Sequence, residues 1–143
     1  MEITEMTALE LGRCIQKREI SATEAAEAFL SKIEASDGKL NAYISVLREE
    51  ALSQAAIVQK KIDAGDLTSP LAGVPVALKD NICTKDVRTT CASKILGDFR
   101  PPYDATIVER LSASGAVLLG KLNMDEFAMG STSETSFFGS VKN

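Results

Sequence analysis

The sequence predicts an α/β fold in which a helical region, residues 1–65, precedes the first strands and helices of a core, residues 66–143. Capping boxes and apolar residues repeating every three or four positions dominate the first region. Continuous apolar segments bounded by glycine and proline dominate the second region. They predict a strand, an irregular crossover, a helix and another strand, in that order. That order is typical of a βαβ unit with parallel strands. Because so few strands leave sheet edges uncovered, we expect part of a larger domain.

The first two helices are predicted from their capping residues. Thr7 and Ser21 are each followed three residues later by glutamate, which is the capping-box pattern. The first helix should end near Lys17, and the second at Asp37-Gly38, because glycine commonly terminates helices. The later elements are expected to be a strand at 42–47, a helix at 48–64, strands at 74–79 and 116–120 with a helix at 105–114 between them, and a short helix at 123–129.

Composition narrows the class of protein. The chain has 143 residues, of which 45% are hydrophobic and 25% charged, as in a soluble globular domain. Its formal net charge of -4 argues against a broad nucleic-acid surface. No apolar stretch approaches the ~20 residues of a membrane span, and the N-terminus lacks a signal-peptide pattern, so we expect the cytoplasm. The cysteines form no C-x-x-C pair and are expected to pack as free thiols without a metal: Cys14, Cys83 and Cys91.

One lysine stands out as a candidate base. Lys79 ends the apolar segment 70–78 and is followed at once by polar residues. Without any histidine, these residues exclude Ser–His–Asp and Cys–His arrangements. Burial disfavours the charged form of a lysine and lowers its pKa, which allows the amine to accept a proton. The residues alone also allow the ordinary alternative, in which Lys79 forms a salt bridge with Asp80 at the strand end.

Two further patterns have a chemical and an ordinary explanation. Ser36 and Lys39 have the S-x-x-K spacing, but we expect Gly38 to break the helix that such a pair requires. The loop 130–136 is rich in hydroxyls. Ser131 and its neighbours could offer backbone amides and hydroxyls to a substrate, or the hydroxyls could serve only the local backbone.

Three segments, residues 71–81, 115–131 and 136–143, resemble the amidase signature family, and the N-terminal pattern from Thr7 onward is similar too. Within this family the likeness is to the members that supply ammonia for amidation on tRNA. The resemblance implies the amidase signature fold, a mixed sheet covered by helices, of which this chain would be an N-terminal fragment.

The resemblance also implies the site residues. The family uses a Ser–cis-Ser–Lys triad, and its G-V-P-x-x-x-K-D motif places the catalytic lysine at Lys79. Met129, Gly130 and Ser131 match the loop that lines the substrate pocket. Both serines belong to a Gly/Ser-rich signature expected beyond Asn143, so this segment alone is expected to be inactive.

The function that the resemblance implies is hydrolysis of the side-chain amide of glutamine. The ammonia would serve a heterotrimer with subunits B and C, one of which uses ATP and magnesium to convert Glu-tRNA(Gln) to Gln-tRNA(Gln) in protein synthesis. No cofactor is expected in this chain, and tRNA would be reached only through the complex. Two alternatives remain: an amidase of the same family acting alone on small amides, and a scaffold segment that binds a partner without chemistry.

Overall fold

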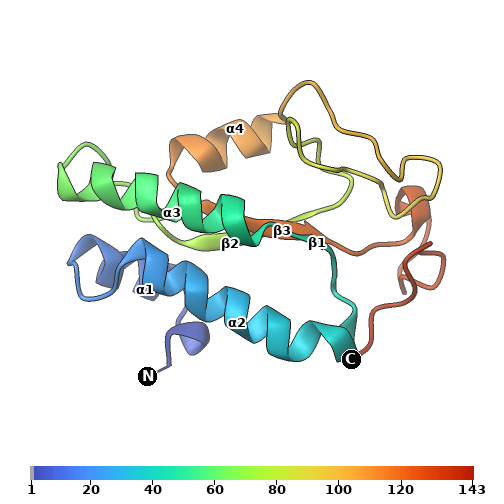
Figure 1. Ribbon diagram of the computed structural model, residues 1–143, viewed down its shortest axis with the longest axis horizontal. Coiled ribbons are helices and arrows are strands. Elements are labelled where there is room, and N and C mark those ends of the chain that lie inside the picture. Colours follow the sequence, from blue (N-terminus) through green and yellow to red (C-terminus); the bar gives the residue numbers. More distant parts are fainter. Residues whose placement is uncertain (1) are drawn as a thin grey trace. The chain divides into compact units, whose positions relative to one another are not determined.

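The computed structural model describes residues 2–143. Two helices come first, and strands and helices then alternate along the chain; this content confirms the predicted α/β class. No helix in this part of the chain is both long and apolar enough to cross a membrane. In order, the elements labelled in Figure 1 and the two short 3₁₀ turns are η1 (Ile3–Glu5), α1 (Ala8–Gln16), α2 (Ala22–Leu40), β1 (Tyr43–Val46), α3 (Arg48–Asp63), β2 (Pro75–Lys79), α4 (Thr106–Ala113), β3 (Val117–Leu122) and η2 (Glu126–Ala128).

Both predicted capping boxes are confirmed. The Thr7 hydroxyl accepts from the amide of Glu10, whose carboxylate accepts from the amide of Thr7 at 2.9 Å. Ser21 and Glu24 exchange the same two hydrogen bonds, at 2.8 and 3.1 Å. Each box therefore satisfies amides that the first turn of a helix leaves unpaired.

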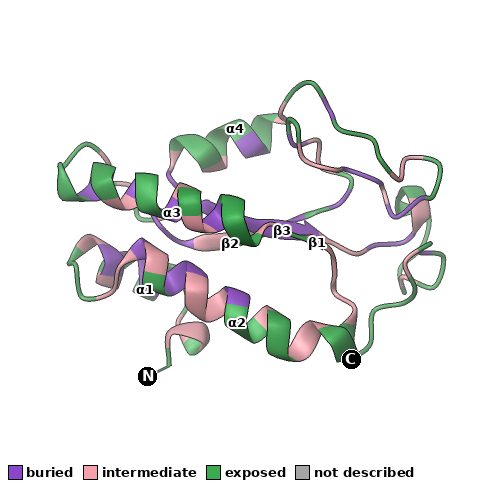
Figure 2. Cartoon of the chain, in the orientation of Figure 1, coloured by how far each residue is buried: buried purple, intermediate pink, exposed green. Residues whose placement is uncertain are grey.

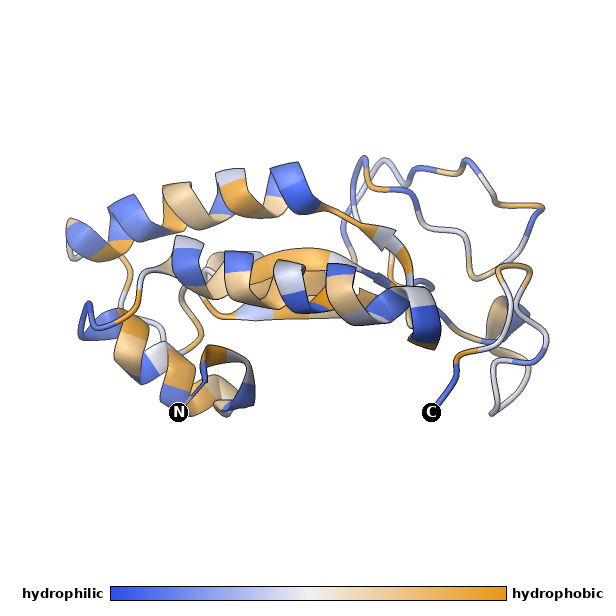
Figure 3. Cartoon of the chain, turned by 60° about the horizontal axis from the view of Figure 1, so that its bottom comes forward, coloured by the Kyte–Doolittle hydropathy of each residue, from blue (hydrophilic) through white to orange (hydrophobic). Residues whose placement is uncertain are grey.

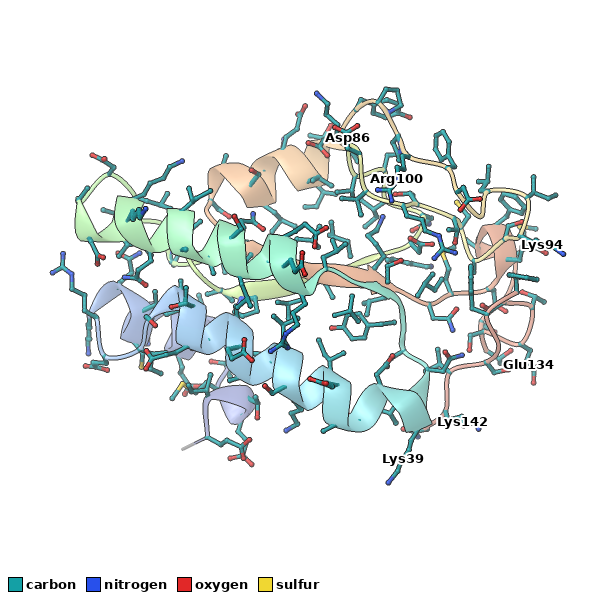
Figure 4. All side chains as sticks on the ribbon, viewed as in Figure 1. Lys39, Asp86, Lys94, Arg100, Glu134 and Lys142 are labelled. Carbon is teal, nitrogen blue, oxygen red and sulfur yellow. The ribbon has the colours of Figure 1, made fainter. Side chains whose placement is uncertain are left out.

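The predicted end of α2 is wrong. The helix passes through Gly38 and ends at Leu40, because Asn41 takes the left-handed conformation with φ 57° that terminates helices. The Asp37 carboxylate accepts from the amide of Ala42 at 2.8 Å and fixes this end. Ser36 and Lys39 thus lie in one helix, contrary to expectation. Lys39 is nevertheless exposed (Figure 4), unlike the lysine of a buried Ser–Lys site.

The three strands form a mixed sheet in the order β1-β3-β2. Strand β1 is antiparallel to β3, with Tyr43 opposite Leu122. Between β2 and β3, the amide of Val117 donates to Val74 and the amide of Asp80 donates to Leu122. The numbers of the bonded residues increase in the same direction along both strands, so this pair is parallel and the predicted βαβ unit is present. Strand β3 is central and is mostly buried (Figure 2).

The chain packs as two compact units. The first contains residues 2–35, 47–76 and 110–119. Its helices are amphipathic, with hydrophobic and hydrophilic bands alternating along them in Figure 3. Its core is lined by Leu11, Ile15, Ala22, Ala25, Ala26, Leu30, Ala51, Ala55, Val58, Ile62, Ala72, Val117 and Leu119.

The second unit contains residues 36–46, 77–109 and 120–143, and so includes every predicted site residue. Its segment 84–103 contains no helix or strand, as predicted for a long irregular connection. A domain boundary near residue 65 stays a prediction.

Candidate active site

The end of β2 separates two neighbouring charged residues. Lys79 is exposed, whereas the side chain of Asp80 is fully buried. Side chains alternate between the two faces of a strand, so these two residues point to opposite sides. Within residues 2–143, the preceding apolar segment therefore does not cover Lys79. Burial of Lys79 in the complete protein stays a prediction.

The buried lysine of this site is Lys121, on the neighbouring strand β3. Its Nζ lies 3.6 Å from Oδ1 of Asp80, and neither side chain is exposed. The ammonium also donates to the carbonyl of Ile82 at 2.8 Å and to Oγ1 of Thr89 at 2.9 Å. Burial lowers the pKa of Lys121, and the charge of Asp80 opposes that shift. The alternative pairing of Asp80 with Lys79 is thus wrong.

Asp80 also anchors the irregular connection. Its Oδ2 accepts from the amide of Thr90 at 2.9 Å and from the Thr90 hydroxyl. Its carbonyl accepts from the amide of Cys91, whose own carbonyl accepts from the amide of Phe127 at 2.9 Å. These backbone hydrogen bonds link the end of β2 to the 3₁₀ turn η2, which precedes the hydroxyl-rich loop.

The cysteines near these hydrogen bonds are free thiols. Burial raises the pKa of the Cys91 thiol, and the nearby charge of Asp80 raises it further. Cys83 lies with its Sγ 3.7 Å from the hydroxyl of Tyr103, and that contact raises the pKa of Tyr103. A thiol with a raised pKa is a poor nucleophile near neutral pH, so Cys91 is unsuited to that role.

The loop after β3 is organised by Asp125. The predicted short helix at 123–129 is only the 3₁₀ turn η2, because Phe127 and Ala128 take left-handed conformations with φ of 51° and 60°. The carboxylate of Asp125 accepts from the amide of Ser133 at 2.8 Å and from the hydroxyl of Thr135 at 2.9 Å. The Ser133 amide is the main cause that lowers the pKa of Asp125.

The predicted substrate residues lie on the exposed part of this loop. Met129, Gly130 and Ser131 are all exposed, and Met129 retains 79% of its accessible surface. The hydroxyls of Ser133 and Ser136 serve local groups, by accepting from a backbone amide and donating to a side chain respectively. The ordinary explanation thus applies to Ser133 and Ser136. A role of Ser131 toward a substrate stays a prediction. Within residues 2–143, no hydrogen bond joins Lys79 directly to residues 129–131.

Two residues of this region, Lys121 and Asp125, are not among the catalytic and substrate-binding residues that the sequence predicts. Lys121 has a sequence signal, since a lysine inside the apolar run 116–122 must find a buried partner if the strand is central. Asp125 has no comparable signal, because its role depends on where the loop amides fold. Within residues 2–143, no three His, Cys, Asp or Glu side chains group to hold a metal ion.

A family model and several known relatives match this α/β chain over most of its length. The family model described as Amidase matches residues 24–143, and the chain belongs to that family. It is 58% identical over 144 residues to a glutamyl-tRNA(Gln) amidotransferase subunit of Lachnoclostridium phytofermentans and 56% identical to the protein of the same name from Geobacter sulfurreducens. It covers 29% of the length of each of these relatives, and they cover the whole chain.

Solved structures agree with this assignment. The native peptide amidase of Stenotrophomonas maltophilia matches with a TM-score of 0.87 and 35% identity, over 96% of this chain and 29% of that one. A 6-aminohexanoate cyclic dimer hydrolase matches with a TM-score of 0.85 and 30% identity, over 96% of this chain and 27% of that one. The predicted amidase fold is therefore confirmed for the part of that fold that this chain covers.

Proposed function

We propose that the complete protein is the glutamine-hydrolysing subunit of a glutamyl-tRNA(Gln) amidotransferase. The observation that carries this proposal is the identity of 58% and 56%, over the whole chain, to subunits of that enzyme. The hydrolases among the solved structures share only 35% and 30%. This contrast favours the amidotransferase over an amidase that acts alone on small amides.

Lys79 is the proposed base. Its neutral amine takes the proton of a nucleophilic serine through a bridging serine, both outside these residues, while the serine oxygen attacks the amide carbon of glutamine. The lysine then returns the proton to the departing ammonia, and water releases glutamate from the acyl-enzyme. The exposed position of Lys79 leaves its amine accessible to such partners. Residues 1–143 are proposed to be inactive alone, because Lys79 would lack its nucleophile.

Substrate binding is assigned to Met129, Gly130 and Ser131. The backbone amides of Gly130 and Ser131 make no hydrogen bond within residues 2–143, and both residues are exposed. Two adjacent unpaired amides suit a carboxylate or carbonyl oxygen of glutamine. The ammonia passes to partner subunits B and C in the cytoplasm, where ATP and magnesium bound by a partner activate glutamate on the tRNA. No cofactor or metal is assigned to this chain.

The test uses the full-length protein co-purified with subunits B and C. We expect Lys79→Ala to abolish amidation of Glu-tRNA(Gln) with glutamine as donor, while added ammonia restores it, because ammonia bypasses the amide hydrolysis. Loss of both activities would indicate an assembly role, and retention of both would refute the proposal. Hydrolysis of small amides by the protein without partners would favour the stand-alone amidase. Binding of a partner subunit that requires residues 1–65, with no amidase activity detected, would favour the scaffold.

A further inference from the structure

The carboxylate of Asp125 is surrounded by donors from the loop that follows it. Oδ2 accepts from the amides of Thr132 at 3.1 Å and Ser133 at 2.8 Å. Oδ1 accepts from the hydroxyl of Thr135 at 2.9 Å and from its amide at 3.4 Å. Asp125 is only 7% exposed, whereas residues 127–132 are all exposed. One buried anion therefore holds an otherwise exposed segment through charge-assisted hydrogen bonds.

Gly130 fits this arrangement because it has no side chain. A Cβ placed there would lie 2.5 Å from both Cγ and Oδ1 of Asp125. Real Cβ atoms essentially never come so close, so a side chain at this position would displace the carboxylate from its hydrogen bonds. The loop is thus shaped around a carboxylate at Asp125.

The bonds divide the amides of the loop into two groups. The amides of Thr132, Ser133 and Thr135 are occupied by Asp125, whereas those of Gly130 and Ser131 have no partner within residues 2–143. We propose that Asp125 is a positioning residue, which fixes the loop so that the backbone of Gly130 and Ser131 is held ready for glutamine. This inference rests on the proposed function for the identity of the substrate.

The key variant is Asp125→Asn in the full-length complex. Asparagine keeps the shape but replaces one acceptor oxygen with a donor. In either orientation of the amide, the backbone amides of Thr132 and Ser133 or that of Thr135 therefore lose their acceptor. Glu134→Gln is the matched control, because it removes one negative charge from the same loop at an exposed residue without a partner within residues 2–143 (Figure 4). Gly130→Ala should reproduce the effect of Asp125→Asn from the other side of the contact.

Two measurements separate positioning from general stabilisation. We expect Asp125→Asn to raise the KM for glutamine about tenfold or more, with a smaller change in kcat and unchanged amidation from ammonia. Hydrogen exchange of the amides in residues 132–135 should become about tenfold faster or more, and Glu134→Gln should change neither quantity. An unchanged KM or unchanged exchange would overturn the proposal. If glutamine hydrolysis, amidation from ammonia and thermal stability were all lost together, the proposal would also be overturned, in favour of a structural role.

The exchange measurement keeps this inference distinct from the proposed function. If the wild-type complex does not hydrolyse glutamine, the proposed function fails, and with it the assigned substrate. Faster exchange in Asp125→Asn would then still establish Asp125 as the residue that orders the loop. If glutamine hydrolysis is normal and exchange is unchanged, only the positioning inference fails.

Discussion

Lys121 and Asp80 form an ion pair with 3.6 Å between Nζ and Oδ1, and neither side chain is exposed to solvent. Lys121 lies on β3, and Asp80 directly follows Lys79, the proposed catalytic residue at the end of the neighbouring strand β2. Because removing charges from water is costly, such a pair persists only when both members are present with their hydrogen bonds. The pair therefore fixes the end of β2 from which Lys79 projects.

The first prediction concerns this pair. Asp80→Asn leaves a buried ammonium unpaired, and Lys121→Met leaves a buried carboxylate unpaired, so each should lower the free energy of unfolding by about 3–5 kcal/mol. The double variant should cost clearly less than the sum, since it removes both charges. Urea unfolding measures all three, with the exposed Lys39→Met as a control expected to change stability by less than about 0.5 kcal/mol. Strictly additive effects would show that the two charges do not interact.

Two helical glycines should respond to alanine with opposite signs. A Cβ at Gly12 in α1 would lie 1.9 Å from the carbonyl oxygen of Pro70, whereas one at Gly38 in α2 would meet nothing within 4 Å. Gly12→Ala should therefore destabilise the protein by about 1–3 kcal/mol. Gly38→Ala should stabilise it by about 0.5–1 kcal/mol, because alanine favours the helix. Thermal melting of both variants tests the pair, and a shift in the same direction would contradict the packing described for these helices.

The pH dependence of the loop follows from Asp125. Hydrogen bonds from the Ser133 amide and its neighbours lower the pKa of this carboxyl in the folded chain below the ~3.9 of an unfolded aspartate. The resulting stabilisation is complete above the unfolded value and is lost as pH falls through the lower folded value. An NMR titration of the Ser133 amide from pH 6 to pH 2 should show a midpoint below ~3.9 that is absent in Asp125→Asn. A midpoint at or above that value would mean that the amides do not bind the carboxylate.

Much of the fold follows from local sequence signals. The capping boxes at Thr7 and Ser21 start helices as predicted, because their hydrogen bonds involve only residues three positions apart. The end of α2 differs from the prediction because Asn41, and not Gly38, takes the left-handed conformation. Local preference allows either residue to end the helix, and the bonds of the Asp37 carboxylate to the following amides decide between them.

The site is less accessible to sequence reasoning. Lys79 stands out in the sequence because it ends an apolar segment, but strand alternation exposes it and buries Asp80. Which lysine lies beside that carboxylate depends on the register of β2 against β3, and no local pattern specifies a register between strands that are separated by a long connection. The role of Asp125 likewise depends on the path of the following loop, whose residues 131–136 are all polar, so its composition does not identify the acceptor.

The most direct test of the central claim is kcat for glutamine hydrolysis by the full-length complex carrying Lys79→Arg. Arginine keeps the positive charge but cannot lose a proton, so a base at this position must fail. We predict that kcat falls by about 10²-fold or more, as far as in Lys79→Ala, while the exposed Lys39→Arg remains at the wild-type rate. Circular dichroism confirms that the variants are folded. Near-normal turnover of Lys79→Arg would contradict the account and leave Lys79 as an ordinary residue at the end of a strand.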